Sequence, residues 1–259
     1  MTEKKLTIRP RQTPATFLHS EYAPDIEGLK ADIAFLGIPY GEAYNYADIV
    51  NDQTNAPAAM RAASLPILRG LERYDFDIGG TLYDGKPIRA VDCGDVWGDH
   101  LDLKAHVRRA EEAVRGILKA GALPIVLGGD HAIPIPVLRA FDQQEPLTLV
   151  QIDQHIDWRD EVNGVHHGLS STMRRASEMS HIDEIFQIGL RATGSARTEE
   201  VEAARAYGAH LITAYELHDV GMDIVEITPK HDVNQITCIT AGRLIVNLIG
   251  QAVRAGYFG

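Results

Sequence analysis

The sequence predicts an α/β fold, specifically a three-layer α/β/α domain built around a mainly parallel sheet. Short apolar segments alternate with amphipathic helical segments along the chain. The apolar segments are rich in Ile, Val and Leu without a polar residue at every second position, which is typical of strands buried on both faces. The sequence contains no low-complexity linker and no internal repeat, so we expect residues 1–259 to form a single domain, with residues 1–30 as an extended arm.

Seven apolar segments are expected to form strands, namely 32–37, 88–91, 123–127, 147–152, 185–188, 211–213 and 222–227. The clearest helix covers 103–120, where apolar residues recur every three or four positions. Asp102 is expected to cap the start of this helix and Gly121 to end it. A last helix, 241–255, is apolar around much of its circumference, so we expect it to pack directly on the sheet.

Composition and charge exclude several classes of function. A formal net charge of −11 argues against nucleic acid or an anionic membrane as a partner. No apolar run approaches the ~20 residues needed to cross a bilayer. The first residues lack the apolar stretch of a secretory signal, and Cys93 and Cys238 provide no disulfide framework, so we expect a cytoplasmic protein. The acidic balance is compatible with a cationic substrate or a bound metal, and equally with a surface that is merely soluble.

Two motifs place metal-ligand side chains at strand ends. In "QIDQHIDWRD", Asp153, His155 and Asp157 occupy alternate positions directly after an apolar strand. Alternate residues of an extended segment point to the same side, roughly 6–7 Å apart. In "PIVLGGDHAIPI", His131 follows a second strand and the Gly128-Gly129 turn. Because ligands collect at the carboxyl ends of parallel strands, the two motifs together predict a metal-centred hydrolase.

These motifs give the chain a resemblance to the ureohydrolase family of arginases and agmatinases, and most of all to its agmatinase-type branch. The similarity is collinear from about residue 32 onward, through "GIPYGEAYNYADIVNDQTNAPAAMRAAS", "DCGDV", "LGGDHAIPIP", "DQHIDWRD", "HHGLSSTMRRA", "QIGLR" and "MDIVEITPKHDVNQITCITAGRLIVNLI". The resemblance implies an arginase-like fold and hydrolysis of a small cationic guanidino substrate to urea and an amine. It also implies two manganese ions, or nickel or another divalent ion, and a trimeric or hexameric homo-oligomer.

The resemblance also implies roles for individual residues. His131, Asp153 and Asp157 would hold the first ion, and Asp153 would bridge to a second ion that His155 also binds. Such an arrangement suits the reaction because a guanidinium group is a poor electrophile, and a pair of divalent ions lowers the pKa of a shared water toward neutrality.

Two further residues would act on the substrate, again by resemblance. His167 would line the pocket and assist proton transfer to the leaving nitrogen. Glu226 would accept the planar guanidinium through paired hydrogen bonds. The loop 41–46 would shape the mouth of the pocket.

The chain departs from the family at one place. A segment of the form S-x-D-x-D-x-x-D-P is expected between "LITAYELHDVG" and "MDIVEITP", but Gly221 is followed directly by Met222. By resemblance this segment is an internal strand that contributes one more bridging aspartate and one more ligand for the second ion. Its loss would leave the neighbouring strands to re-pair and would open a large void, which is costly in a protein core.

Two explanations of this departure stay open. Either the 259 residues lack a strand–helix segment that the complete polypeptide contains, and the protein is a hydrolase, or the deletion is genuine. In the second case the chain is a degenerate, non-catalytic subunit that assembles with an active homologue.

Several neighbouring residues are expected to have structural roles. Gln154 should point away from the metal ligands, because it alternates with them. The "DCGDV" segment, 92–96, is expected to be a strand-end turn more than a metal site. His106 is placed on the polar face of the helix 103–120, and His166 in a solvated or locally bonded loop position. Asp130 suits a supporting contact to a ligand and a helix N-terminus equally well.

Overall fold

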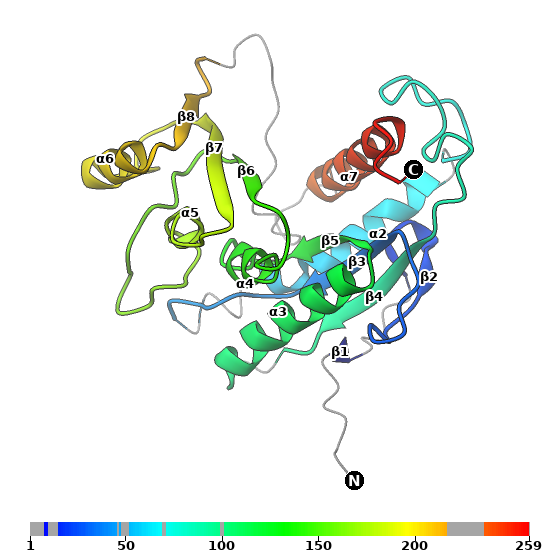
Figure 1. Ribbon diagram of the computed structural model, residues 1–259, viewed down its shortest axis with the longest axis horizontal. Helices are drawn as coiled ribbons and strands as arrows, with labels where there is room; N and C mark the ends of the chain where they lie inside the picture. The colour runs from blue at the N-terminus through cyan, green and yellow to red at the C-terminus, as the bar shows by residue number, and fades with distance from the viewer. Residues whose placement is uncertain are drawn as a thin grey trace.

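A computed structural model describes residues 8–9, 15–45, 47, 52–68, 71–98, 101–216 and 236–258 (Figure 1). Its strands are β1 (Ile8–Arg9), β2 (Glu21–Tyr22), β3 (Ile33–Ile38), β4 (Ala90–Val96), β5 (Leu123–Gly128), β6 (Leu147–Ile152), β7 (Ile182–Leu190) and β8 (His210–Thr213). Its α-helices are α2 (Ala56–Leu68), α3 (Leu103–Lys119), α4 (Pro134–Arg139), α5 (Thr172–Ala176), α6 (Thr198–Tyr207) and α7 (Ile236–Arg254), with short 3-10 helices η1 (Phe17–His19) and η2 (Asp52–Asn55). The alternation of strands and helices confirms the predicted α/β class.

The first sheet is the middle layer of three, with helices on both faces. Its order is β1-β4-β3-β5, with β2 also pairing with β4, and all pairs except β1 with β4 are parallel. Alternate residues of β3 enter different cores, because successive side chains of a strand point to opposite faces. Ile33 and Phe35 pack with α2 and α7, whereas Ala34 and Leu36 pack with α3. This part of the molecule is the predicted α/β/α sandwich.

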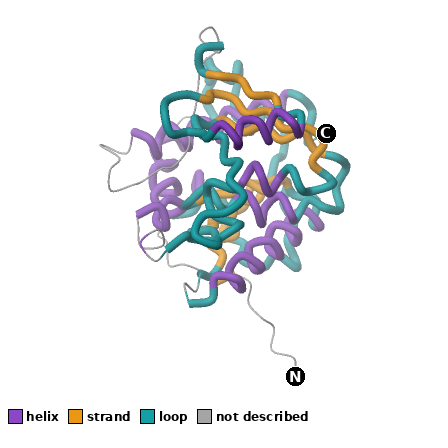
Figure 2. Tube along the Cα trace, turned by 90° about the vertical axis from the view of Figure 1, so that its left-hand side faces the viewer, coloured by secondary structure: helices purple, strands orange, loops and turns teal. Residues whose placement is uncertain are grey.

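The remaining strands form a separate sheet. β6, β7 and β8 are parallel and pair in that order, and Figure 2 shows the strands in two groups. One face of this sheet packs through Ile185 against residues of α5 and α6, while Val150 and Ile152 on β6 are 53% and 44% exposed. Among the described strands, β5 pairs only with β3, and β6 pairs only with β7. The expected re-pairing across the missing strand is therefore not found in the described residues.

The predicted elements mostly lie where the sequence placed them. The first six expected strands appear as β3 to β8, although β4 starts later and runs further than 88–91. The seventh, 222–227, and the 221/222 junction lie outside the described residues. The carboxylate of Asp102 accepts a hydrogen bond from the backbone N–H of Ala105 at 3.0 Å, and α3 ends just before Gly121, whose φ is 79°. Both boundaries of this helix were predicted correctly.

Two expectations about β4 and α3 are wrong. The "DCGDV" segment is not a strand-end turn, because it lies inside β4. Its carboxylates stay buried there since Arg61 on α2 forms salt bridges with Asp92 at 2.7 Å and with Asp95 at 2.5 Å. His106 is not on the polar face of α3 but fully buried, with Nε2 2.7 Å from the carbonyl oxygen of Tyr40.

The C-terminal helix begins earlier than 241 and buries Val246, Ile249 and Val253 in the core that β3 and α2 also line. Its predicted packing on the sheet is thus confirmed. None of the described helices is long and apolar enough to cross a membrane.

Candidate metal centre

The two predicted strand exits meet. One atom each of His131, Asp153 and Asp157 lies within 4.8 Å of the others. Nδ1 of His131 is 2.6 Å from Oδ2 of Asp157 and 3.4 Å from Oδ2 of Asp153. The histidine follows β5 and the carboxylates follow β6, so the cluster joins the two sheets although their strands do not pair.

The turn before His131 depends on a glycine. A Cβ on Gly129 would lie 1.9 Å from the carbonyl oxygen of Pro39 and 2.8 Å from its carbonyl carbon. Backbone atoms cannot give way as a flexible side chain can, so only glycine fits between the ends of β3 and β5. The close approach places His131 beside the loop that follows β3.

The carboxylates converge through a turn and not through strand alternation. β6 ends at Ile152, and Oδ1 of Asp153 accepts a hydrogen bond from the backbone N–H of His155 at 2.8 Å. Asp157 has a φ of 46°, and its carbonyl oxygen accepts hydrogen bonds from the N–H groups of Met173 and Arg174 where α5 begins. The predicted convergence is correct, but the extended geometry predicted for it is wrong.

His155 stands beside this cluster. Its Nδ1 is 3.2 Å from Oδ1 of Asp153, and its Nε2 is 2.9 Å from Nε2 of Gln154. Gln154 therefore does not point away from the ligands, as strand alternation predicted, because the chain is no longer extended at this position. Asp153 and His155 are the two side chains predicted to hold a second ion. In the described residues, no group of three close ligands contains both of them.

Asp130 connects the cluster to the loop after β3. Its two carboxylate oxygens accept hydrogen bonds from the backbone N–H groups of Gly41 and Ala132, at 2.8 and 2.7 Å. Burial raises the pKa of Asp130, while the two N–H groups lower it. Asp130 thus supports the position of His131 by holding the residue after it, Ala132, next to the loop that follows β3.

His167 lies in the loop before α5, opposite the loop 41–45. Its Nδ1 is 3.3 Å from Oε2 of Glu42. Burial lowers the pKa of His167, Arg139 lowers it further, and Glu42 raises it. The hydroxyl of Tyr44 accepts a hydrogen bond from the backbone N–H of Ser170 at 2.9 Å, so the two loops are held together. His166 bonds locally to the carbonyl oxygen of Asp160, as expected of a loop residue. Glu226, and Tyr46 of the loop 41–46, lie outside the described residues.

Two cavities meet at His131. A polar one of about 250 Å³ is lined by His131, His155, Asp157, Trp158, Arg159, Leu169, Ser170, Gly194, Ser195 and Glu200. Nε of Arg159 is 3.4 Å from Oε1 of Glu200, so its wall contains charges of both signs. A pocket of this size with convergent polar groups suits a small polar ligand.

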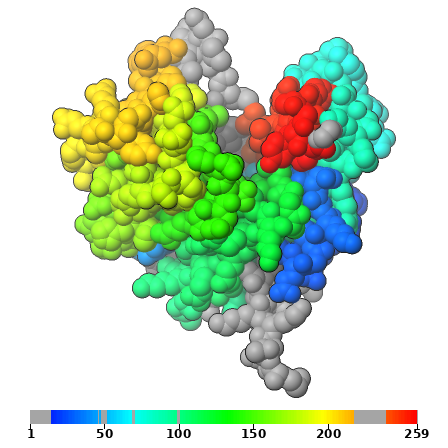
Figure 3. Space-filling model, in the orientation of Figure 1, coloured from blue at the N-terminus to red at the C-terminus, as the bar shows by residue number. Residues whose placement is uncertain are grey.

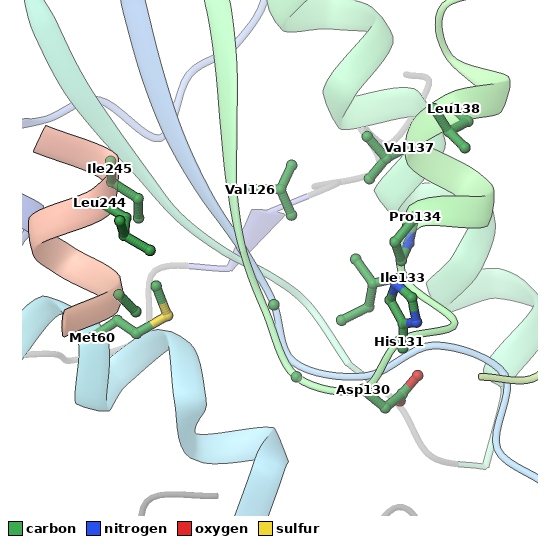
Figure 4. Close-up of a pocket in the computed structure, with 13 residues that line it drawn as sticks. Met60, Val126, Asp130, His131, Ile133, Pro134, Val137, Leu138, Leu244 and Ile245 are labelled. Atoms are coloured by element: carbon green, nitrogen blue, oxygen red, sulfur yellow. The ribbon is translucent and has the colours of Figure 1, made fainter. Parts of the chain in front are cut away.

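The second cavity, about 430 Å³, is mainly apolar and is lined in part by β5, along the edge that pairs with no described strand. Figure 4 shows Val126 on β5, Ile133 and residues of α4 on one side, with Met60, Leu244 and Ile245 facing them. Figure 3 shows the surface hollowed between α7, in red, and the green segment that carries β6.

Sequence reasoning missed two polar residues at the centre. Gln151 on β6 and Gln187 on β7 are buried next to the carboxylates. The available signal was a single amide within each apolar strand segment, "LTLVQI" and "IFQIGL". A buried polar group requires a partner, so both positions pointed to a polar contact inside the sheet.

Comparison with known proteins agrees with this geometry. A sequence profile of the arginase family matches residues 31–222. Guanidinobutyrase of Pseudomonas aeruginosa is 31% identical over 201 residues, which cover 76% of this chain and 59% of that protein. Agmatinase of Bacillus subtilis is 27% identical, over 78% of this chain and 64% of that protein. The chain thus spans less than two thirds of either relative.

Solved structures show the same fold. Proclavaminate amidinohydrolase of Streptomyces clavuligerus superposes with a TM-score of 0.77 at 23% identity, covering 93% of this chain and 97% of that chain. Arginase of Medicago truncatula gives a TM-score of 0.67 at 20% identity, covering 86% and 88%. The match of the profile over most of the chain, together with the arginase-like architecture, shows that this chain belongs to the arginase family.

Proposed function

We propose that the protein is a divalent-metal-dependent hydrolase that cleaves a guanidino C–N bond and releases urea and an amine, as an agmatinase does. The observation that carries this proposal is the convergence of His131 with two buried carboxylates. In the part of the chain that the structure describes, no Lys or Arg forms a salt bridge with Asp153 or Asp157. Two close, buried carboxylates without a Lys or Arg partner favour binding of a cation.

The donor set fits a divalent ion. One imidazole nitrogen and two carboxylate oxygens are ligands suited to manganese and similar metals, and nickel is a further candidate. When bound, such an ion acts as a Lewis acid and makes water a nucleophile near neutral pH. We propose manganese at His131, Asp153 and Asp157. A second ion at Asp153 and His155 requires ligands beyond those two.

The residues around the ion would orient the substrate and move protons. We propose that His167, beside Glu42, donates a proton to the leaving nitrogen, and that Glu226 accepts the guanidinium. The polar cavity at His131 and His155 has room for a small substrate. Relatives named guanidinobutyrase and agmatinase support a small guanidino compound as the substrate class. We further propose a cytoplasmic homo-oligomer, trimeric or hexameric, without nucleic acid or membrane as a partner.

A second candidate is a non-catalytic subunit that forms a hetero-oligomer with an active homologue. It is favoured by the edges of β5 and β6 that pair with no described strand and by the single three-residue ligand group of the described residues. The intact mass of protein from its natural source separates the two candidates. A mass of 28.5 kDa favours the subunit, and a mass larger by a strand–helix segment favours the enzyme.

The activity is tested by metal analysis together with urea release from agmatine and from 4-guanidinobutyrate. In the complete enzyme, His131→Ala and Asp153→Ala should each lose bound manganese and urea release. His166→Ala is the control, because this imidazole bonds only to the loop carbonyl of Asp160 in the described contacts, and it should keep both. Failure of the natural protein to bind any divalent ion after refolding with manganese would refute the proposed site.

A further inference from the structure

A buried amide contacts both carboxylates of the metal centre. Gln151 lies on β6, and its Nε2 is 3.2 Å from Oδ2 of Asp153 and 2.9 Å from Oδ2 of Asp157. An amide nitrogen has two hydrogens, so both are directed to the carboxylates. These are the same carboxylate oxygens that face Nδ1 of His131.

A second amide holds the first. Gln187 is opposite Gln151 in the parallel register of β6 and β7, and it is fully buried. Its Nε2 donates hydrogen bonds to Oε1 of Gln151 and, at 2.8 Å, to the carbonyl oxygen of Ile156. The side chain of Gln187 therefore spans from the strand to the turn that carries the ligands.

The backbone carbonyl of Ile156 fixes the direction of both amides. A carbonyl oxygen only accepts hydrogen bonds, so the nitrogen of Gln187, and not its oxygen, must face it. The same nitrogen then faces the oxygen of Gln151, which turns the nitrogen of Gln151 toward the carboxylates. The reverse orientation would place the oxygen of Gln151 against two carboxylates. The assignment of oxygen and nitrogen, often ambiguous for glutamine, is thus set by the network.

We propose that Gln151 and Gln187 are positioning residues that form an amide relay, in which Gln187 orients Gln151 and Gln151 holds Asp153 and Asp157 at the spacing that accepts a divalent cation. The relay rests on the proposed function in so far as it assigns the cluster to a metal. It stabilises two neighbouring carboxylates with neutral donors, so their negative charge remains available to the cation. A lysine or arginine in the same place would compete with the ion.

Removal of the relay should weaken metal binding without removing a ligand. Residues that hydrogen-bond to metal ligands commonly contribute a factor of about 10 to 100 to metal affinity. We expect Gln151→Leu, which retains a similar side-chain volume, to raise the Kd for Mn²⁺ by roughly this factor. Gln187→Leu should raise it by a similar or smaller factor, because Gln187 contacts neither carboxylate directly.

A double-mutant cycle tests the relay on the full chain by titration calorimetry with Mn²⁺. The loss of Mn²⁺ affinity in the Gln151→Leu/Gln187→Leu protein should be smaller than the product of the two single losses, since part of the effect of Gln187 passes through Gln151. Ile185→Val, a buried apolar change two residues before Gln187 on β7, is the control for lost packing. It should lower the Tm and leave the Kd unchanged. Multiplicative losses in the double variant, or an equal loss in Ile185→Val, would overturn the relay.

A second measurement needs no metal and so separates this proposal from the proposed function. In the metal-free protein, the side-chain NH₂ signals of Gln151 should be shifted and protected from exchange in a ¹⁵N–¹H spectrum. Gln187→Leu should return them toward the position of an exposed glutamine such as Gln144. If the wild type binds no Mn²⁺ but shows this coupling, the metal assignment falls and the relay stands. If Gln187→Leu leaves the Gln151 signals in place, the relay falls.

Discussion

Gly129 shows how a single residue positions the metal centre. The chain must pass against the backbone of Pro39 to bring His131 from the end of β5 to the carboxylates after β6. The glycine pair was visible in the sequence as a turn, and so was the chemistry of the ligands. The close approach of Gly129 to Pro39 could not be predicted, because Pro39 lies 90 residues earlier in the chain (129 − 39).

Gly129→Ala should therefore lower both the Tm and the affinity for Mn²⁺, because Pro39 or the turn has to move away from the new methyl group. Gly28→Ala is a matched control, since a Cβ there would meet nothing closer than the Asp25 side chain at 3.6 Å. Thermal unfolding and metal titration of the two variants check the prediction. Equal behaviour of Gly129→Ala and Gly28→Ala would show that the turn tolerates a side chain.

The strands and helices were predicted from the pattern of apolar residues. This prediction succeeded where burial of apolar side chains alone decides the structure. It failed in β4, where a charged segment continues a strand because a distant arginine neutralises it. It failed again at the end of β6, where a glutamine-supported turn replaces extended chain. Arg61 is 31 residues before Asp92, and Gln187 is 31 residues after Ile156, so a local pattern contains neither contact.

The pairing of α2 with β4 through Arg61 yields a stability prediction. Arg61→Met should reduce the free energy of unfolding by about 3–5 kcal/mol, because Asp92 and Asp95 would remain buried without their partner. Arg108→Met on α3 removes an exposed pair with Glu112 and should change it by less than about 0.5 kcal/mol. Urea unfolding of both variants makes the comparison. A small effect of Arg61→Met would mean that the two carboxylates find water or another partner.

The packing of α3 against the loop after β3 predicts a dependence on pH. Burial lowers the pKa of His106, while its contacts to the carbonyl oxygens of Trp97 and Tyr40 act in the opposite direction. The folded state therefore favours the neutral ring. Stability from this group is fully present above the ordinary histidine pKa of about 6.5 and is lost as the pH falls below it. The Tm should fall more steeply from pH 7 to pH 5 in the wild type than in His106→Gln, and parallel slopes would contradict the assignment.

At the scale of the whole molecule, the candidate metal centre lies where the two sheets meet. His131 follows β5 of the five-stranded sheet, whereas Asp153 and Asp157 follow β6 of the three-stranded sheet. An ion held by all three would link the two sides and stabilise the folded chain by about 2.7 kcal/mol at a concentration 100 times its Kd. The sequence predicted the class of this fold and the convergence of His131, Asp153 and Asp157. The division of the described strands into two sheets was not predicted, because it depends on long-range packing that a local pattern does not contain.

We propose that the described residues provide one three-ligand site for a divalent ion and only two ligands of a second. Native mass spectrometry tests it in one measurement, because it reports the mass of the chain and the number of ions it carries. A 28.5 kDa chain titrated with Mn²⁺ should retain one ion per chain, and Asp157→Asn should retain none. A chain of this mass that binds no ion, or that holds two ions with equal strength, would contradict the account.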